Sequence, residues 1–593
     1  MSVSGQPSVS YRRTFFRLLG FLRPYRRSLV VSIVLAAGSQ ALALVLIFLT
    51  RAVIPAIRDG EHRRLWEIVG AFVLVGLGKA AMTVGRRFIS GKQALAVEMD
   101  LRRDVYAKLV RLSFRFYDRH QTGQLMSRAT VDLQGVRFFL GYGLIFFFQN
   151  ALTVIGVTVA MVIVDWRLAL ISFAITPLLI AIAYRYSHVA HPLLRDVQQK
   201  LADVATVAEE NIVGVHVVKS FAQEPAEQAK FERRSELVFG QSVRTNRQRA
   251  FYVPLLAFLP LVAQAAVVYV GGRRVVDHDL TLGSFIAFNL LLTMLVQPLR
   301  TLGMWIGQAQ RATASGERIF QVIDELEDVA DRDTSHDLPD GPGRVRFEHV
   351  TFGYDPERPV LHDVDLELEA GKTVALIGHT GAGKTSLAAL IPRFYDVQAG
   401  RVTIDGADVR EVTLRSLRSE IGIVSQDPFL FSATVRDNIA FGAERATDEQ
   451  VERAARLAQA HEFVAALPQG YDTVIGERGI TLSGGQRQRI AIARALVVDP
   501  RVLILDDATA SVDATTEMKI RAGLREAARG RTTVIIAHRL STIALADEIV
   551  VLEDGHVAAR GTHETLVDAN EVYREIYEHG LLERVIHERE EVA

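Results

Sequence analysis

The chain has 593 residues, 49% of them hydrophobic, and equal numbers of acidic and basic side chains leave it with no net charge. A chain of this length is expected to hold more than one domain, and its apolar residues are concentrated before about residue 305. The zero net charge gives no bulk attraction to nucleic acid. The absence of cysteine excludes disulfides, thiolate metal sites and thiol catalysis.

The N-terminal segment is basic and amphipathic. No acidic residue precedes Asp59, and arginines crowd the segment, while Phe15, Leu18, Leu19 and Leu22 fall at helical spacing. This pattern predicts a helix over about residues 11–22 that lies on the membrane surface. An organelle transit peptide has a similar composition and is the alternative.

Six segments are apolar and long enough to cross a bilayer. They cover about residues 29–50, 65–84, 138–164, 168–184, 251–272 and 282–299. Lys79 interrupts the second, and only Asp165-Trp166-Arg167, a short hairpin with an interfacial tryptophan, separates the third from the fourth. Uncharged polar side chains within the spans either line a cavity or form interhelical hydrogen bonds. They are Gln40, Gln149, Asn150, Gln264, Asn289 and Gln297.

Long charged segments separate spans two and three, and spans four and five. They hold about fifty and about sixty-five residues and keep helical apolar periodicity. Helices of roughly thirty residues would reach about 45 Å past the membrane. The turns at about 117–126 and 211–217 are then expected to be coupling helices, the alternative being merely solvated helical extensions. The membrane domain is expected over 1–325. A breaker-rich linker over 326–343, a second domain over 344–580 and a charged tail over 581–593 follow.

The second domain carries a phosphate-binding loop. An apolar run that reads as a buried strand precedes Gly378-His379-Thr380-Gly381-Ala382-Gly383-Lys384-Thr385, and helical spacing begins at Ser386. Strand, glycine-rich loop and helix form the context of a P-loop. The glycines let backbone N–H groups surround phosphates, and the helix start adds partial positive charge. Lys384 would neutralise the β- and γ-phosphates, and Thr385 would ligate Mg²⁺.

Two further motifs identify the kind of P-loop protein. Leu482-Ser483-Gly484-Gly485-Gln486 lies roughly a hundred residues later, and a buried strand then ends in Asp506, a carboxylate suited to magnesium. Together these residues resemble the nucleotide-binding domain of an ATP-binding cassette (ABC) transporter. With the spans and stalks, the resemblance implies an exporter-type fold. This fold is an α-helical six-span membrane domain with long cytoplasmic helical stalks, followed by an α/β P-loop ATPase domain with a helical subdomain.

The resemblance also implies the cofactors, ATP and Mg²⁺, and the roles of individual residues. Tyr354 would stack on adenine, and the segment 473–479 resembles the exporter-specific loop before the signature. The nucleotide-binding residues would be Tyr354, Gly378, His379, Thr380, Gly381, Ala382, Gly383, Lys384, Thr385, Ser386, Ser483, Gly484, Gly485, Gln486 and the D-loop Asp513. The metal ligands would be Thr385, Gln426 and Asp506, and the catalytic residues Asp507, Gln426 and the switch histidine His538.

One position departs from the family pattern. Asp507 stands where most members carry a glutamate that polarises the attacking water, and the D-loop reads Ala510-Ser511-Val512-Asp513. Aspartate is one methylene shorter, and a misplacement of about 1 Å can cost on the order of a hundredfold in rate. The signature is intact. The resemblance is therefore to heterodimeric exporters with one degenerate site, with a slow homodimer as the alternative.

The leading hypothesis for function is a half-transporter that exports hydrophobic or amphipathic compounds, such as drugs, lipids or peptides, by hydrolysing ATP. Its expected partners are a second half-transporter chain and the bilayer, without nucleic acid. Its expected location is a bacterial inner (plasma) membrane, with the nucleotide-binding domain in the cytoplasm. An importer of a siderophore or lipid and a regulatory ATP-gated subunit are the alternatives. No motif specifies the substrate.

Overall fold

The computed structural model of the chain describes residues 11–443, 445–476, 479, 482–507, 514–537 and 540–578. Its contacts divide the chain into two compact units. The first comprises residues 1–107 and 125–324, and the second comprises residues 108–124 and 325–593. The short segment 108–124 therefore makes its contacts with the second unit, although in the chain it lies between two spans of the predicted membrane domain.

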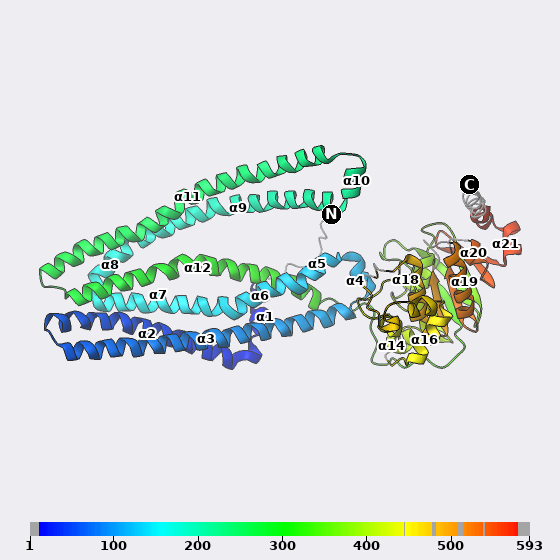
Figure 1. Ribbon diagram of the computed structural model, residues 1–593, viewed down its shortest axis with the longest axis horizontal. Coiled ribbons are helices and arrows are strands. Elements are labelled where there is room, and N and C mark those ends of the chain that lie inside the picture. Colours follow the sequence, from blue (N-terminus) through cyan, green and yellow to red (C-terminus); the bar gives the residue numbers. More distant parts are fainter. Residues whose placement is uncertain are drawn as a thin grey trace. The chain divides into compact units, whose positions relative to one another are not determined.

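The first unit is built of helices, most of them long (Figure 1). They are α1 Tyr11–Gly20, α2 Arg26–Arg58, α3 His62–Arg111, α5 Thr122–Ser127, α6 Leu133–Phe138, α7 Leu144–Val164, α8 Trp166–Ala174, α9 Thr176–Val213, α10 Val215–Ser220, α11 Glu224–Val276 and α12 Leu282–Ile323. A 3₁₀ turn η1 (Arg23–Tyr25) precedes α2, and π-helical turns η2 (Arg128–Asp132) and η3 (Phe139–Gly143) flank α6. Helices α9 and α11 lie side by side and are joined through α10 (Figure 1).

Five of the described helical segments are long and apolar enough to cross a membrane. They are Arg23–Arg58, His62–Arg111, Thr122–Val164, Trp166–Val213 and Glu224–Val276, and α12 adds a shorter apolar stretch over Leu282–Pro298. Several continue far beyond a bilayer thickness. The 53 residues of α11 correspond to about 80 Å of helix. The stretches beyond the apolar windows are the helical stalks.

Small residues let the membrane helices approach closely. The buried positions of α2 include Ser32, Ala36, Ser39 and Ala43, which recur at three- and four-residue intervals and so share one face. In η3, a Cβ added to Gly141 would lie only 2.1 Å from the Cβ of Ala94 in α3. The two backbones therefore pass in direct contact at this point.

The N-terminal helix α1 is attached to the end of α12. Arg17 forms an ion pair with Asp324, and its guanidinium lies 4.0 Å from the centre of the Phe320 ring. Leu18 is fully buried against Gly316 of α12. An ion pair, a cation–π contact and an apolar contact thus join two elements three hundred residues apart.

The turn between α7 and α8 is fixed by Asp165. Its carboxylate accepts hydrogen bonds from the backbone N–H groups of Arg167 and Leu168, both at 3.0 Å, which caps the start of α8. The same carboxylate forms an ion pair with Arg274 of α11. The three-residue hairpin predicted from the sequence is therefore held by a cap and a charge pair.

The second unit contains two sheets and short helices (Figure 1). The four-stranded sheet has the order β2-β1-β4-β5, and the six-stranded sheet has the order β10-β9-β3-β8-β7-β6. The strands are β1 Val345–Phe352, β2 Leu361–Leu368, β3 Thr373–Ile377, β4 Ala399–Ile404, β5 Ala407–Asp408, β6 Ile421–Val424, β7 Val502–Asp506, β8 Thr532–Ile536, β9 Glu548–Glu553 and β10 His556–Gly561. In the larger sheet, β9, β3, β8, β7 and β6 are parallel. Strands β3 and β8 are buried along their whole length, as expected where helices cover both faces.

Helices surround these sheets and form a subdomain between β6 and β7. The helices of the second unit are α4 Phe114–Arg119, α13 Lys384–Leu390, α14 Leu414–Ser419, α15 Val435–Ala440, α16 Asp448–Leu457, α17 His461–Ala465, α18 Gly484–Leu496, α19 Ala514–Ala528, α20 Leu540–Ile543 and α21 His563–Ala569, with a 3₁₀ turn η4 at Gly470–Asp472. The core of this subdomain is continuous with that of the larger sheet, because one buried cluster joins Val451 and Ile475 to Leu503 and Ile535.

Candidate functional site

The sheet order brings the predicted site residues to one edge. Strands β3, β8, β7 and β6 are neighbours and run parallel, so their carboxyl ends lie together. In register, Ile536 pairs with both Leu376 and Asp506. The glycine-rich loop after β3, the two aspartates that end β7 and the segment after β6 that carries Gln426 therefore share this edge.

The loop between β3 and α13 needs its glycines for two different reasons. Gly378, Gly381 and Gly383 all have positive φ angles, of 151°, 90° and 98°. A Cβ at Gly378 would lie 2.1 Å from the carbonyl oxygen of Leu552, so only glycine fits there. A Cβ at Gly381 would meet nothing within 4 Å, so the space beside this residue is open. The loop therefore has the positive φ angles and the open side at Gly381 that a phosphate-binding loop needs.

Lys384 lies in the first turn of α13 and is buried. Its Nζ donates hydrogen bonds to the carbonyl oxygens of Gly378, at 2.7 Å, and His379, at 3.0 Å. Burial lowers the pKa of this ammonium, and the charge of Asp506 acts in the opposite direction. The loop thus holds a cation in place across its opening. A phosphate bound there would place negative charge beside this buried ammonium.

Asp507 is held rigidly at the end of β7. Its φ is +39°, its backbone N–H donates to the carbonyl oxygen of Ile536 at 3.1 Å, and the residue is 8% exposed. Its Oδ1 is buried and has no hydrogen-bond partner within the described part of the chain. A buried carboxylate oxygen without a partner costs free energy, which indicates a site built to receive a further group.

The side chains at this edge that could bind a metal ion do so through carboxylate, hydroxyl and amide oxygen atoms. The described residues contain no group of three or more His, Cys, Asp or Glu side chains that could hold a metal ion. Asp506 offers a carboxylate at the end of β7, while Thr385 and Gln426 are exposed at the start of α13 and after β6. One carboxylate, a hydroxyl and substrate phosphates are the ligands that Mg²⁺ typically uses beside water. The residues present therefore fit a nucleotide-bound magnesium ion.

The signature residues form the start of α18. Ser483 caps this helix. Its Oγ accepts from the N–H of Gln486 at 3.2 Å, and the Gln486 side chain accepts in return from the N–H of Ser483 at 2.9 Å. Ser483 is exposed and Gly485 is buried. This reciprocal capping box presents a hydroxyl and the positive end of a thirteen-residue helix to the surface, which suits a phosphate.

Tyr354 follows β1 and remains 39% exposed. Its hydroxyl bonds to Ser386 Oγ of α13 at 3.0 Å, and its ring meets the Tyr395 ring edge-on at 5.2 Å between centroids. The ring is thereby fixed beside the helix that begins at the phosphate loop. Such a fixed and exposed aromatic ring can stack on a base.

Some predicted residues lie outside the described part of the chain. These are Asp513, with the D-loop residues before it, His538, and part of the loop over 473–479.

Comparisons with known proteins agree with this geometry. The family model described as the ABC transporter transmembrane region matches residues 29–299, and that described as ABC transporter matches residues 361–510. The chain is 36% identical over 565 residues to the ATP-dependent lipid A-core flippase of Syntrophus aciditrophicus, covering 95% of this chain and 94% of that protein. It is 39% identical over 568 residues to the multidrug efflux ATP-binding/permease protein Rv0194 of Mycobacterium tuberculosis, covering 95% of this chain and 47% of that protein. A solved structure of a bacterial Atm1-family ABC exporter with ATP bound superposes with a TM-score of 0.75 at 32% identity, covering 93% and 98% of the two chains.

The chain belongs to the ATP-binding cassette transporters. It is an exporter-type half-transporter in which a helical membrane domain is fused to an ATP-hydrolysing domain, so the predicted fold class is confirmed. ABC half-transporters of this type work as dimers in a membrane, where ATP hydrolysis drives the movement of hydrophobic substrates. The predicted ATPase activity coupled to transport is therefore also confirmed.

An aromatic contact in the ABC transporter's second unit was not singled out from the sequence. Phe114 of α4 packs on Phe394, with ring centroids 4.5 Å apart, and Tyr395 donates its hydroxyl to Asp118 Oδ2 of α4 at 2.9 Å. The pKa of Tyr395 is raised, mainly by burial of its hydroxyl and to a smaller extent by the hydrogen bond to Asp118. The Tyr395 ring also touches Tyr354. One indication of this contact was present in the sequence, because α4 overlaps a predicted coupling turn. Nothing in the residue spacing pairs Tyr395 with Asp118.

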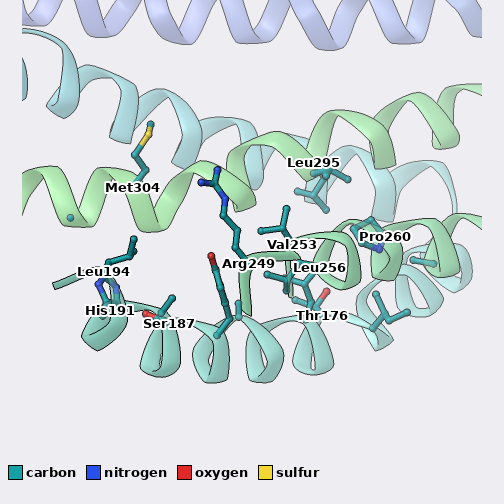
Figure 2. A pocket seen from close by; sticks show the side chains of 18 of the residues that line it. Thr176, Ser187, His191, Leu194, Arg249, Val253, Leu256, Pro260, Leu295 and Met304 are labelled. Atoms are coloured by element: carbon teal, nitrogen blue, oxygen red, sulfur yellow. The ribbon is translucent and has the colours of Figure 1, made fainter. Parts of the chain in front are cut away.

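The first unit of the transporter contains a cavity of about 880 Å³ (Figure 2). Residues of α8, α9, α11 and α12 line it. None of the uncharged polar residues singled out within the spans belongs to this lining. Asn150 instead donates to the hydroxyl of Thr301, and Asn289 to the carbonyl oxygen of Phe285. The Asn150 bond joins α7 to α12 and is one of the two predicted uses of such residues, whereas the Asn289 bond lies within α12 and is neither of them.

Proposed function

We propose that this chain is one half of a heterodimeric ABC exporter that moves hydrophobic or amphipathic compounds, namely drugs, lipids or peptides. Its location would be a bacterial inner membrane, with the ATPase domain on the cytoplasmic side. The apolar-lined cavity in the membrane domain supports a substrate with a large hydrophobic part. The names of two relatives, a lipid A-core flippase and a multidrug efflux protein, support the same substrate range.

In this proposal the residues at the sheet edge bind MgATP. Lys384 and the loop N–H groups hold the β- and γ-phosphates, Tyr354 stacks on the base, and Thr385, Gln426 and Asp506 hold Mg²⁺. His538 and Asp513 complete the site. Ser483 and Gly485, at the start of α18, contact the nucleotide held by the second chain. Bound MgATP supplies a γ-phosphoryl group whose transfer to water drives transport.

The short side chain of Asp507 is the main observation in support of a heterodimer. A glutamate at this position would extend one methylene further, and the hydrogen bond from the Asp507 N–H to the carbonyl oxygen of Ile536 opposes a backbone shift that would compensate. The Asp507 carboxylate is therefore too short to polarise a water at full efficiency. The signature at Ser483 is regularly capped, so this chain completes a competent site for its partner while its own site turns over slowly.

The asymmetry of the two sites provides the test. In the purified pair, replacing the partner chain's catalytic glutamate with glutamine should abolish ATP turnover, whereas Asp507→Asn should change turnover less than about threefold. Steady-state phosphate release measures both. Equal and large losses from the two substitutions would contradict the proposal and favour two catalytic sites, as in a slow homodimer.

The remaining alternatives predict different readouts in inside-out vesicles. An importer on the same architecture would move substrate out of such vesicles on addition of ATP, whereas the exporter moves it in. A regulatory ATP-gated subunit would bind ATP without moving substrate in either direction.

A further inference from the structure

The cavity in the membrane domain has one cationic end. Its lining contains two arginines, Arg249 of α11 and Arg311 of α12, together with His191 of α9, and it contains no acidic residue. Within the described part of the chain, neither arginine forms an ion pair. Arg311 donates only to the side-chain oxygen of Gln308, at 3.1 Å. The cavity therefore carries positive charge that no protein carboxylate neutralises.

The charged side chains lie toward one end of the cavity, and most of the apolar side chains lie toward the other. Helices α9 and α11 are antiparallel neighbours, and α12 packs against α11. His191, Arg249 and Arg311 consequently fall toward one end, whereas Leu256, Pro260, Leu292 and Leu295 fall toward the other. Figure 2 shows Arg249 extending between the helices on the side of His191, Leu194 and Met304, with Pro260 and Leu295 at the opposite side. Tyr186 and Ser187 add hydroxyl groups to the lining, and Ser187 lies beside His191 (Figure 2).

The polarity of the cavity changes at the ends of the predicted spans. The lining from residues 172–183, 253–263 and 292–296 lies within predicted spans and is mostly apolar. The charged lining residues His191, Arg249 and Arg311 lie beyond those spans, where α9, α11 and α12 continue into the stalks. About 19 residues separate Leu292 from Arg311 along α12, which corresponds to roughly 28 Å of helix. That length accommodates an extended acyl chain with its head at the stalk side.

We propose that this cavity selects amphiphiles with an anionic head, phosphate or carboxylate, whose head pairs with Arg249 and Arg311 while the hydrophobic chain enters the spans. The inference rests on the proposed function, since it names the substrate class of the same transporter. Two guanidinium groups offer planar pairs of donors that match phosphate and carboxylate oxygens. A cationic amphiphile would place like charge beside both arginines and is rejected.

The test uses the full-length transporter in nanodiscs of zwitterionic phosphatidylcholine. Binding of radiolabelled dodecyl phosphate is compared with binding of dodecyltrimethylammonium, which has the same chain and opposite charge, with empty nanodiscs giving the background from lipid partition. Dodecyl phosphate should bind at least tenfold more tightly. Arg249→Gln should lower the affinity for dodecyl phosphate about tenfold, because a hydrogen bond to a charged group is lost. Arg249→Lys should retain most of the affinity.

The matched control is Arg244→Gln. Arg244 is an exposed arginine of the same helix that does not line the cavity, so its removal should leave dodecyl phosphate affinity within twofold. The double variant Arg249→Glu with Arg311→Glu should bind dodecyltrimethylammonium better than dodecyl phosphate, a gain that a misfolded protein cannot give. Equal affinities for the two amphiphiles in the natural protein, or equal losses from the Arg249 and Arg244 variants, would overturn the inference.

The outcomes for binding and transport are separable. ATP-driven uptake of dodecyltrimethylammonium but not of dodecyl phosphate into inside-out vesicles would leave the export proposal standing and refute the anionic selectivity. Arginine-dependent binding of dodecyl phosphate without ATP-driven uptake of any amphiphile would support the selectivity and refute export.

Discussion

Lys384 combines burial, charge and an unusual pair of hydrogen-bond partners. Both acceptors of its ammonium belong to the loop that it closes, so the side chain shapes the loop as well as supplying charge. Its removal therefore has two costs. The cation proposed to bind phosphate is lost, and the carbonyl groups of Gly378 and His379 lose a donor.

Lys384→Ala should weaken ATP binding at this chain's own site by at least about tenfold, because charge-assisted bonds to phosphate are lost. Equilibrium titration with a fluorescent ATP analogue measures this affinity. Lys372→Ala is the control, since Lys372 is a half-exposed lysine of the same domain whose ion pair is with Glu369. An unchanged affinity in the Lys384 variant would show that the loop is wrongly assigned.

At the level of elements, aromatic rings connect α4 to Tyr354, the residue proposed to stack on the base. The route runs from Tyr354 through the Tyr395 ring and its hydroxyl to Asp118. It is short, and all of its members lie in one compact unit. We therefore propose that Tyr395 couples occupation of the nucleotide site to the position of α4.

Tyr395→Phe should lower the amount of substrate transported per ATP hydrolysed by about fivefold, because it deletes the bond to Asp118 and keeps the ring contacts. Paired transport and phosphate-release assays give this ratio. Tyr471→Phe removes a comparable bond, from a tyrosine hydroxyl to His461, within the helical subdomain and should leave the ratio unchanged. If both variants kept the natural ratio, the proposed route would carry no coupling.

The close contact between η3 and α3, at Gly141 and Ala94, leads to a second prediction about the helices. Gly141→Ala should destabilise the membrane domain by about 1–3 kcal/mol, since the new methyl would overlap Ala94 and overpacking outweighs the gain in helix propensity. Gly76→Ala in α3 is the control, because a Cβ there meets nothing within 4 Å. Thermal unfolding in detergent should show a lower midpoint for the first variant only. A higher midpoint for Gly141→Ala would contradict this close approach.

These elements also mark what the sequence could and could not predict. The P-loop, the strand that ends in Asp506 and the capped start of α18 were predictable, because each depends on local glycines, β-branched runs and caps. The pairing of Tyr395 with Asp118 was not, because 277 residues separate them and no periodicity links them. The arginines of the cavity also escaped notice. They lie just outside the apolar spans, where arginine is ordinarily a sign of the membrane boundary.

The helix bounds were predicted only in part. Apolarity gave spans of about twenty residues and helical periodicity gave stalks of roughly thirty, and the structure joins span and stalk in α3 and α11, which run for 50 and 53 residues without a break. Charged stalk residues continue the helix because hydrogen bonding along the backbone does not depend on hydropathy. The π-helical turns around α6 gave no sequence signal at all.

At the scale of the whole molecule, the short carboxylate of Asp507 predicts that this chain needs a different partner chain for full ATPase activity. Purified alone as a dimer, it should hydrolyse ATP at least about tenfold more slowly than the pair with its partner, because both of its sites would then rely on Asp507. Coupled ATPase assays at saturating ATP compare the two preparations. Equal turnover numbers would remove the basis for a heterodimer.

The attachment of α1 to α12 limits how the transporter can move. Arg17 and Leu18 hold the amphipathic helix to the last turns of α12, while Phe16 remains 67% exposed and available to lipid. A helix seated at a bilayer surface glides freely in the plane but resists being lifted out or pushed in, because either displacement changes the water contact of its apolar face. With α1 on the membrane surface, as the sequence predicts, the end of α12 would share that restriction. We therefore expect the segment after Asp324 to be displaced mainly in the plane of the membrane.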